Sequence, residues 1–511
     1  MAVNRFRAFR GKLFDKFLNG VEKVGNALPH PATLFGLMAL IILICSAIAV
    51  AVDWTAMHPG TGQLIEPVNL LSRDGIHRIL TDMVVNFTSF APLGIVMVAM
   101  LGIGIAESSG LIGAVIRLIV LSSPRKLLTF VLVLAGIMSN TASDVGYVLL
   151  IPLAGIIFIA VRRHPVIGMA AAFAGVSGGF SANLVLGTID PLLAGLSEEA
   201  AQIIDPGYLV NPTANYYFMV ASTVVIAFTG TWVTERFIAP RFGKYEGDGA
   251  DEKLDKLSPI EKKGLRRAGY VALVILAATL VTIIPSQGFF RGTDGQVLSS
   301  PLIRGVVAML FITASLMGIA YGITIRKYRS DADVMNGMAD AMKTLAMYYV
   351  LVFFAAQFVA YFKWSNLGII FAIKGANLVM ASGLELIPLM ILFIILSGLI
   401  NLAMGSASAK WAIMAPVFIP MFMLLGYSPE LSQVVYRIGD SVTNIISPMM
   451  SFFALIIAFI QKYEKKAGIG TVIATMLPYT FAFFIVWTLL LIAWLLLGLP
   501  LGPGAGIYYS Y

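Results

Sequence analysis

Apolar runs long enough to cross a lipid bilayer recur along the whole chain. A transmembrane helix needs about 20 predominantly apolar residues, and charged or helix-breaking residues divide the sequence into nine such runs. We place them near residues 32–52, 83–106, 165–195, 215–239, 268–286, 300–325, 338–362, 428–460 and 471–498. This pattern predicts an all-α polytopic membrane protein with nine transmembrane helices.

Two further apolar regions, at about 127–160 and 385–425, are too long for one ordinary span, and each has a polar centre. The centre is 139–144 in the first region and 401–410 in the second. Unpaired backbone groups are costly in hydrocarbon, so such segments are expected to face protein, ions or water. Each region is therefore predicted to be a re-entrant hairpin, in which two half-length helices are joined by a polar tip.

Basic residues beside the runs orient the chain. The first hairpin is bracketed by Arg125 and Lys126 at one end and by Arg162 and Arg163 at the other, which favours entry and exit on the cytoplasmic side. With the N-terminus placed in the cytoplasm, the predicted inside segments carry 25 Lys and Arg, and the outside segments carry 5. The second hairpin then enters from the opposite side, and the C-terminus lies in the periplasm.

The chain divides into two halves, residues 1–240 and 268–511, joined by a hydrophilic cytoplasmic linker at 241–267. In each half the hairpin is followed by a span that small and polar residues interrupt, at about 165–195 and 428–460. The order of parts is the same in both halves.

The spacing of prolines supports an internal repeat. Pro152 and Pro416 are separated by the same length of chain as Pro165 and Pro429. The first unit starts outside and the second starts inside, so the repeat is inverted. Inverted repeats with discontinuous helices are typical of secondary transporters that bind their cargo near the bilayer midplane.

Polar and charged residues of the tips and broken spans form the candidate site. A charge inside the membrane costs about 2.5–3.5 kcal/mol on insertion scales, so each one needs compensation, and side-chain oxygens suit Na⁺. Candidates for ion coupling are Asp144, Asp190, Asp440 and Asn444. Candidates for substrate binding are Asn183, Asn401, Lys410, Trp411 and Arg437. Pro416, Pro429 and Pro448 are expected to interrupt helices.

Several of these residues have two interpretations. Arg437 and Asp440 are three residues apart, so they could pair on one helix face, or Arg437 could bind an anionic substrate. Lys410 could attract a carboxylate or pair with an aspartate across the site. Asp144 and Asp190 could couple transport to H⁺ or Na⁺ or form structural ion pairs, and Trp411 could stack on an aromatic substrate or pack in the core.

Composition agrees with the membrane class. Hydrophobic residues make up 59% of the 511 residues, charged residues make up 12%, and the mean hydropathy is +0.88. The net charge of +8 comes from short basic blocks between apolar runs, which lipid topology explains better than nucleic acid does. We expect the lipid bilayer, and no nucleic acid, as a partner.

The sequence offers little for enzymatic chemistry. Cys45 is the only cysteine, the four histidines form no HExxH pair, and there is no GxxxxGK[ST] loop. We therefore expect no enzymatic activity, no cofactor and no ATP-driven transport. An intramembrane enzyme and a passive channel are the alternatives from other classes.

Four runs of residues carry a resemblance to a known family. They are Gly179 to Leu184 with Asp190, the run from Gly405 to Pro416, the run Met421 to Gly426, and Arg437 to Asp440. Together with Pro29-His30-Pro31, they resemble the p-aminobenzoyl-glutamate transporter (AbgT) family of bacteria over nearly the whole chain. The family's functional positions match Asp190, Ser408, Trp411, Pro429, Arg437, Asp440 and Pro448.

The resemblance implies a homodimeric carrier of the bacterial inner membrane that is driven by H⁺ or Na⁺ and handles p-aminobenzoyl-glutamate or p-aminobenzoate. Some family members export sulfonamide antimetabolites. The first tip, Ser139-Asn140-Thr141, is similar to the tips of related Na⁺-coupled dicarboxylate carriers, which implies Na⁺ at Asn140 and Asp190. Na⁺-coupled dicarboxylate symport is therefore the alternative within the transporter class.

Overall fold

The protein is described by a computed structural model, which covers residue 29 and residues 31–57, 62–141, 146–243, 245, 257–285, 287–292, 295, 297 and 300–509. Helices dominate these residues, and one short antiparallel pair of strands joins β1 (Ala56–Met57) to β2 (Leu64–Ile65). The first half contains α2 (Pro31–Ala51), α3 (Arg73–Thr88), α4 (Ala91–Ser109), α5 (Leu111–Leu121), η1 (Arg125–Leu127), α6 (Leu128–Ser139), η2 (Gly146–Leu150), α7 (Ile151–Ala160), α8 (Pro165–Phe173), η3 (Ala174–Gly178), α9 (Ile189–Ala201), α10 (Tyr216–Val233), η4 (Thr234–Ile238) and η5 (Ala239–Arg241). The second half contains α11 (Pro259–Ile283), α12 (Pro301–Arg304), α13 (Val306–Thr324), α14 (Asp331–Thr344), α15 (Ala346–Trp364), α16 (Leu367–Ser382), α17 (Leu386–Ala403), α18 (Ala407–Leu424), α19 (Pro429–Asn444), α20 (Phe453–Gln461) and α21 (Ile469–Leu496).

The predicted all-α membrane fold is confirmed. Nine helical stretches among the described residues are long and apolar enough to cross a membrane, and seven of them match predicted spans. The other two are α17 and α18, each 18 residues long, which the sequence assigned together to one re-entrant hairpin. The predicted spans at 165–195 and 428–460 consist of shorter helices separated by irregular backbone. The nine stretches are thus not the nine that the sequence predicted.

The first predicted hairpin has shorter arms than the second. Its arms are α6, with 12 residues, and the continuous stretch Gly146–Ala160 of η2 and α7. At 1.5 Å per residue, 12 residues extend about 18 Å, which is well short of the roughly 30 Å hydrocarbon core. Re-entry of either hairpin into the membrane stays a prediction.

Helix boundaries recur in the two halves at one constant separation. The ends of α6 and α7 and the starts of α8 and α9 correspond, at that separation, to the ends of α17 and α18 and the starts of α19 and α20. The proline pairs found in the sequence, Pro152 with Pro416 and Pro165 with Pro429, have the same separation. The inverted orientation of the halves stays a prediction.

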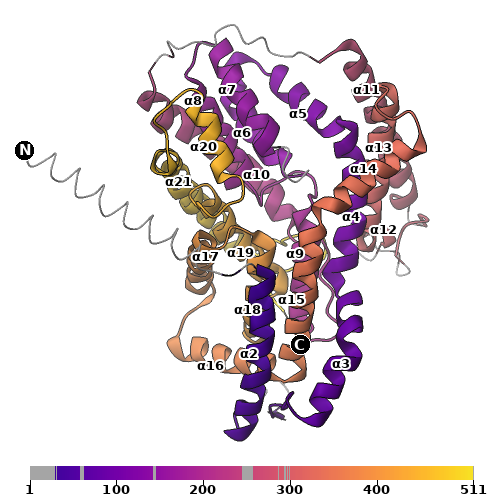
Figure 1. The fold of residues 1–511 in the computed structure, drawn as a ribbon, viewed down its shortest axis with the longest axis vertical. Helices are drawn as coiled ribbons and strands as arrows, with labels where there is room; N and C mark the ends of the chain where they lie inside the picture. The colour runs from indigo at the N-terminus through magenta and orange to yellow at the C-terminus, as the bar shows by residue number, and fades with distance from the viewer. Residues whose placement is uncertain are drawn as a thin grey trace, which may run out of the picture.

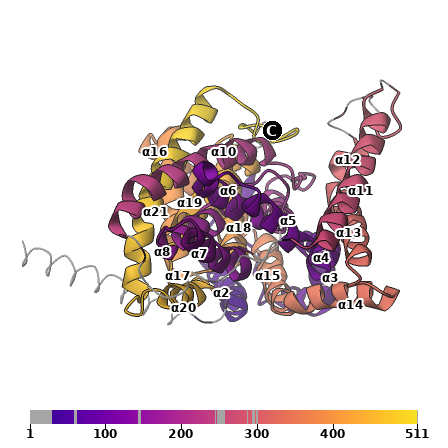
Figure 2. The same ribbon diagram turned by 90° about the horizontal axis from the view of Figure 1, so that it is seen from above.

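The helices form two groups that lie side by side (Figures 1 and 2). On one side, α4 packs against α13 and α14, and α13 packs against α11. On the other side lie the predicted hairpins and broken helices, from α6 to α10 and from α17 to α21. Helix α4 also packs against α9, which connects the two groups.

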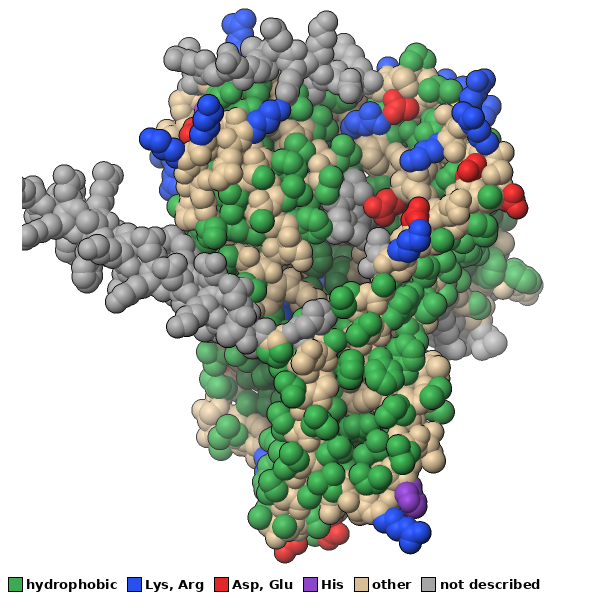
Figure 3. Space-filling view, in the orientation of Figure 1, with side chains coloured by type: hydrophobic (Ala, Val, Ile, Leu, Met, Phe, Trp, Pro, Cys, Tyr) green, Lys and Arg blue, Asp and Glu red, His purple; other side chains and the backbone are tan. Residues whose placement is uncertain are grey.

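The outer surface separates charged from apolar side chains. Lys, Arg, Asp and Glu gather at the two ends of the molecule in the view of Figure 3, and hydrophobic side chains cover most of the surface between them. Exposed hydrophobic residues occur on several candidate spans, for example Leu40 of α2, Val274 of α11 and Leu489 of α21. An apolar band between charged ends is the surface that a bilayer requires.

Helix α19 lies in the core, with 15 of its 16 residues buried. It packs closely against α17, because a Cβ atom at Gly439 would lie only 2.3 Å from the carbonyl oxygen of Ile394. This approach places the polar residues of α19 beside the polar end of α17, where the candidate site is formed.

Candidate functional site

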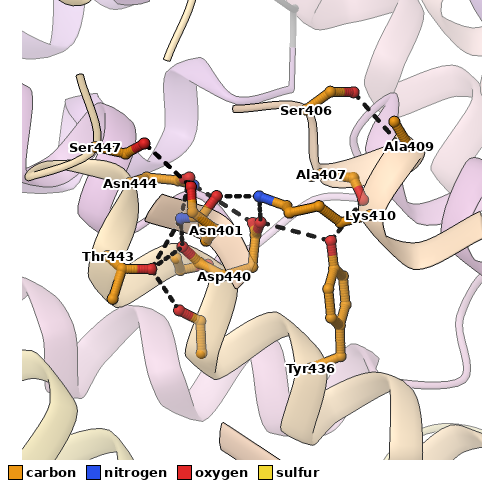
Figure 4. A network of polar contacts seen from close by, with 12 residues as sticks. Asn401, Ser406, Ala407, Ala409, Lys410, Tyr436, Asp440, Thr443, Asn444 and Ser447 are labelled. Atoms are coloured by element: carbon orange, nitrogen blue, oxygen red, sulfur yellow. Dashed lines mark hydrogen bonds and ion pairs between the residues drawn. The ribbon is translucent and has the colours of Figure 1, made fainter. Parts of the chain in front are cut away.

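A network of polar contacts joins the tip of the second predicted hairpin to α19 (Figure 4). The Nζ atom of Lys410 lies 2.5 Å from Oδ1 of Asp440, and both side chains are almost fully buried. Lys410 also donates a hydrogen bond to Oδ1 of Asn401 at the end of α17. Of the two interpretations of Lys410, this contact agrees with pairing to an aspartate.

Asn401 connects this ion pair to the C-terminal turn of α19. Its Nδ2 atom donates hydrogen bonds of 2.8 Å to Oγ1 of Thr443, to Oδ1 of Asn444 and to the carbonyl oxygen of Asp440. The hydroxyl of Ser447, in the break after α19, donates to the carbonyl oxygen of Asn401. Every polar atom of the Asn401 side chain therefore has a partner, and the site is fixed from both helices.

A second buried ion pair joins the two halves of the chain. Nη2 of Arg437 in α19 lies 2.5 Å from Oδ1 of Asp190 in the first turn of α9. The other carboxylate oxygen of Asp190 accepts a 2.6 Å hydrogen bond from the backbone N–H of Gly187. Nε and Nη1 of Arg437 are buried and have no hydrogen-bond partner among the described residues. Each oxygen of Asp190 thus has one partner, whereas Arg437 keeps two donors without a partner among the described residues.

One interpretation of the sequence is wrong. Arg437 and Asp440 do not pair with each other, since each finds an opposite charge on another element. Residues three apart on a helix are near neighbours, but tertiary packing supplies a closer partner for both.

Trp411 of α18 is fully buried and is held by two contacts. Its ring stacks on Tyr436 with centroids 4.5 Å apart, and its Nε1–H donates a 2.9 Å hydrogen bond to Ser197. Ser197 donates in turn to Gln433 of α19. The hydroxyl of Tyr436 donates to the carbonyl oxygen of Ala407 at the start of α18. Trp411 thus connects α18 to α9 and α19. It does not line the cavity between the second tip, the two helix breaks and α4, which is called the central cavity below.

A cavity of about 330 Å³ lies among the second tip, the two helix breaks and α4. Its volume is in the range of small-molecule sites. The lining includes three aromatic residues, Tyr147, Phe180 and Phe452, and several polar residues, among them Glu107, Thr188, Asn444 and Ser451. Glu107 also lines a second cavity, of about 490 Å³, between α4 and α14.

Two helices begin at this cavity. Ile189, the first residue of α9, and Ala407, the first residue of α18, both belong to the lining. Ser406 caps α18 by accepting a hydrogen bond from the backbone N–H of Ala409. The first turn of a helix has unpaired N–H groups and a positive dipole end, so both helices favour a negative charge in the cavity.

The remaining predicted residues are distributed more widely. In the first tip, Ser139 and Thr141 donate hydrogen bonds to carbonyl oxygens of their own helix, while Oδ1 of the buried Asn140 has no partner within the described part of the chain. Asn183 accepts hydrogen bonds from the backbone N–H groups of Leu184 and Val185. Ser408 lies near Ser406 at the second tip, 3.3 Å between hydroxyl oxygens. Asp144 lies outside the described residues.

The three prolines fall at different kinds of position. Pro416 is inside α18, Pro429 is the first residue of α19, and Pro448 is in the break between α19 and α20. Only Pro429 therefore coincides with a helix end, while Pro448 lies within the irregular segment of the broken span.

Of the predicted site residues only Asn444 belongs to the cavity wall, and sequence reasoning missed the aromatic residues of that wall. Tyr147, Phe180 and Phe452 each stand next to a predicted tip or break, but aromatic residues are common in membrane helices and carry no signal of their own. It also missed Ser197 and Gln433, which connect Trp411 to the core through hydrogen bonds. Within the described ranges, no group of three or more His, Cys, Asp and Glu could hold a metal ion.

An apolar outer band, helices that start at a polar-lined cavity and two buried ion pairs define a polytopic membrane transporter, and comparison with known proteins agrees. The model of the AbgT putative transporter family matches residues 16–509, so the chain belongs to this family. The p-aminobenzoyl-glutamate transport protein of Escherichia coli is 39% identical over 490 residues, which cover 96% of each chain. The relatives are transport proteins, and this protein is a transporter rather than an enzyme.

Two solved structures have the same fold. MtrF of Neisseria gonorrhoeae, whose structure is described as illuminating a class of antimetabolite efflux pumps, is 51% identical, with a TM-score of 0.91. The match covers 96% of this chain and all of MtrF. The Alcanivorax borkumensis YdaH transporter is 45% identical, with a TM-score of 0.89, and the match covers 93% of this chain and all of YdaH.

Proposed function

We propose that the protein is an ion-gradient-driven carrier of aromatic organic anions of the p-aminobenzoyl-glutamate and p-aminobenzoate type, and that sulfonamide antimetabolites are among the compounds it exports. The observation that carries the proposal is the composition of the central cavity. Aromatic faces and two helix N-termini line it together, which matches a ligand that has both an aryl ring and a carboxylate. The relatives named for p-aminobenzoyl-glutamate transport and antimetabolite efflux support the same substrate class.

The alternative of dicarboxylate symport is less well supported by the lining. Succinate and citrate have no ring to place against Tyr147, Phe180 or Phe452. The aromatic wall would therefore be left without a partner in a dicarboxylate complex.

We propose that H⁺ or Na⁺ couples to transport through the polar residues around the two tips. Asn140 fits a Na⁺ ligand, because its buried Oδ1 has no partner among the described residues and amide oxygens are suitable ligands. Asp190 fits the same role less well in this conformation, since its charge is already paired with the guanidinium of Arg437, which repels a cation. Asp440 is the other candidate, and it would have to exchange Lys410 for the coupling ion.

The remaining parts of the proposal concern the cell. We propose that the carrier works as a homodimer in the bacterial inner membrane, with the N-terminus in the cytoplasm and the C-terminus in the periplasm. The excess of Lys and Arg on the predicted cytoplasmic side supports this orientation.

Transport by purified protein in proteoliposomes tests the proposal. A pH gradient and a Na⁺ gradient are imposed separately, and movement of p-aminobenzoyl-glutamate, p-aminobenzoate and a sulfonamide is measured with and without an ionophore that removes each gradient. We expect gradient-dependent movement of at least one of the three compounds and no competition by succinate. The Asp82→Asn variant, which changes an exposed carboxylate of α3, is the control for handling and should match the wild type.

Two outcomes contradict the proposal. Absence of gradient-dependent movement of all three compounds removes the substrate assignment. Strong competition by succinate or citrate together with an absolute Na⁺ requirement favours dicarboxylate symport.

A further inference from the structure

We infer that the stacked rings of Tyr147 and Phe452, together with Phe180, form the platform that binds the aryl ring of the transported anion. This inference rests on the proposed function and specifies which residues recognise the aromatic part of the substrate. It also moves that role away from Trp411, the residue for which the sequence suggested it.

The geometry of the pair supports this role. The ring centroids of Tyr147 and Phe452 are 4.6 Å apart, and their planes differ by only 11°. Both residues belong to the lining of the central cavity, as does Phe180. The two rings are already in contact, so no third ring fits between them. A ligand ring placed against the cavity face of the pair extends the stack, and aromatic rings favour such parallel, offset contacts.

The register of the two halves gives an independent reason to treat these positions as one site. Phe180 and Asn444 have the same separation along the chain as Pro152 and Pro416, and so do Thr188 and Phe452. All four cavity positions, Phe180, Thr188, Asn444 and Phe452, line the same space. Each half therefore contributes one aromatic and one polar residue from equivalent positions of its helix break, in the opposite order. The cavity is built from both halves, with an aromatic ring from each.

The same register relates Tyr147 to Trp411. Each stands five residues before a proline, Pro152 in one half and Pro416 in the other. Trp411 is fully buried and stacks on Tyr436, whereas Tyr147 belongs to the cavity wall. Equivalent aromatic positions thus have different surroundings. Of the two, Tyr147 is the residue that contacts the ligand.

The polar part of the cavity completes the recognition. The helix starts at Ile189 and Ala407 favour a carboxylate, while the aromatic residues favour a flat ring. The platform therefore takes an aryl group that carries an acidic substituent. A saturated ring of the same size fills similar space but lacks the flat π face.

The test compares two substrates that differ mainly in the ring. KM is measured in proteoliposomes for p-aminobenzoyl-glutamate and for cyclohexanecarbonyl-glutamate, using the wild type and the variants Phe452→Leu, Tyr147→Leu and Phe180→Leu. In the leucine variants we expect KM for the aryl substrate to rise by about 3- to 10-fold, the size expected from losing one aromatic contact. KM for the saturated compound should stay unchanged.

Two control variants separate ring recognition from general damage. Tyr147→Phe keeps the ring and should keep the wild-type preference for the aryl substrate. Phe453→Leu removes the next ring along the chain, which is buried but does not line the cavity, and should change KM for both compounds equally or not at all. Elution of each variant as a single species in detergent shows that it is folded, and the three leucine variants give separate tests if one of them does not fold.

The result that overturns the inference is an unchanged ratio of the two KM values in the folded leucine variants. If the wild type transports none of p-aminobenzoyl-glutamate, p-aminobenzoate and a sulfonamide, the proposed function fails, and this inference fails with it. If the wild type transports the aryl compound and its preference survives all three ring removals, only the aryl platform is wrong.

Discussion

The two buried ion pairs have similar charge and burial but very different surroundings. Asp440 and Lys410 lie within the second half, and Asn401 supplies hydrogen bonds to the residues around them from α17. Asp190 and Arg437 connect the first half to the second, and two donor atoms of Arg437 have no partner in the described part of the chain. The Lys410–Asp440 pair therefore stabilises the contact of α18 with α19. In the second pair, Arg437 still has donor atoms that could bind another acceptor.

The largest effect is expected from breaking the ion pair of Lys410 and Asp440. Lys410→Met leaves the Asp440 carboxylate buried without its cation, and removing one partner of a buried pair costs about 3–5 kcal/mol. We expect a large fall in the thermal unfolding midpoint in detergent. The double variant Lys410→Met with Asp440→Asn should recover part of the loss because it leaves no buried charge. A Lys410→Met protein as stable as the exposed control Lys343→Met would contradict the structural role.

A smaller effect is expected from Asn401→Ala. The change removes a donor to Thr443, Asn444 and Asp440 and an acceptor for Lys410, and leaving such groups unsatisfied costs about 1–3 kcal/mol. The unfolding midpoint should fall by less than in Lys410→Met. If the two variants lose equal stability, the hydrogen bonds of Asn401 contribute as much to stability as the ion pair of Lys410 and Asp440.

Exchanging the two cations sharpens the comparison. Arg437→Lys keeps the charge opposite Asp190 and removes donors that have no partner in this conformation, so we expect a stability loss of about 1 kcal/mol or less with a clear fall in the transport rate. Lys410→Arg places a larger group in a filled site, and overpacking costs about 1–3 kcal/mol. Unfolding midpoints and initial transport rates are measured for both. A normal transport rate in Arg437→Lys would show that the unused donors have no role in the cycle.

The smallest effect is expected from Trp411→Phe. This change retains a ring against Tyr436 but removes the Nε1–H bond to Ser197, which is worth about 0.5–1.5 kcal/mol. Ser197→Ala removes the same bond from the other side together with the bond that Ser197 donates to Gln433. Both variants should lower the unfolding midpoint and leave the KM ratio for aryl and saturated substrates unchanged. A selective rise in KM for the aryl substrate in Trp411→Phe would return the stacking role to that residue.

Much of the fold could be predicted from the sequence, because apolar run length, breakers and basic flanks are local signals. These signals located seven of the nine long apolar helices, the polar tips and both broken spans. They assigned α17 and α18 together to one re-entrant hairpin, whereas each helix is also long enough to cross, so the re-entry of this region stays a prediction. Residue spacing cannot distinguish two short arms from two full spans when the apolar region is this long.

The buried charges near the cavity could be singled out from the sequence, but their pairing partners could not. Asp190, Lys410, Arg437 and Asp440 stood out because an intramembrane charge needs compensation. Their partners depend on how α9, α17 and α18 pack around α19, and no local pattern encodes that arrangement. The aromatic wall was missed for a similar reason, since its stacked pair of rings comes from opposite halves of the chain and meets only in the folded protein.

The close approach of α17 and α19 has a mechanical consequence. A side chain at Gly439 would collide with the Ile394 carbonyl, and Gly398 lies against Thr443 with little space to spare. Two helices that touch through their backbones cannot slide along one another without first separating, and the hydrogen bonds of Asn401 oppose separation. We therefore expect α17 and α19 to move together as one rigid unit. In the proposed carrier, the displacement that opens the cavity alternately to each side of the membrane is therefore expected at the outer surfaces of this rigid unit, rather than between α17 and α19.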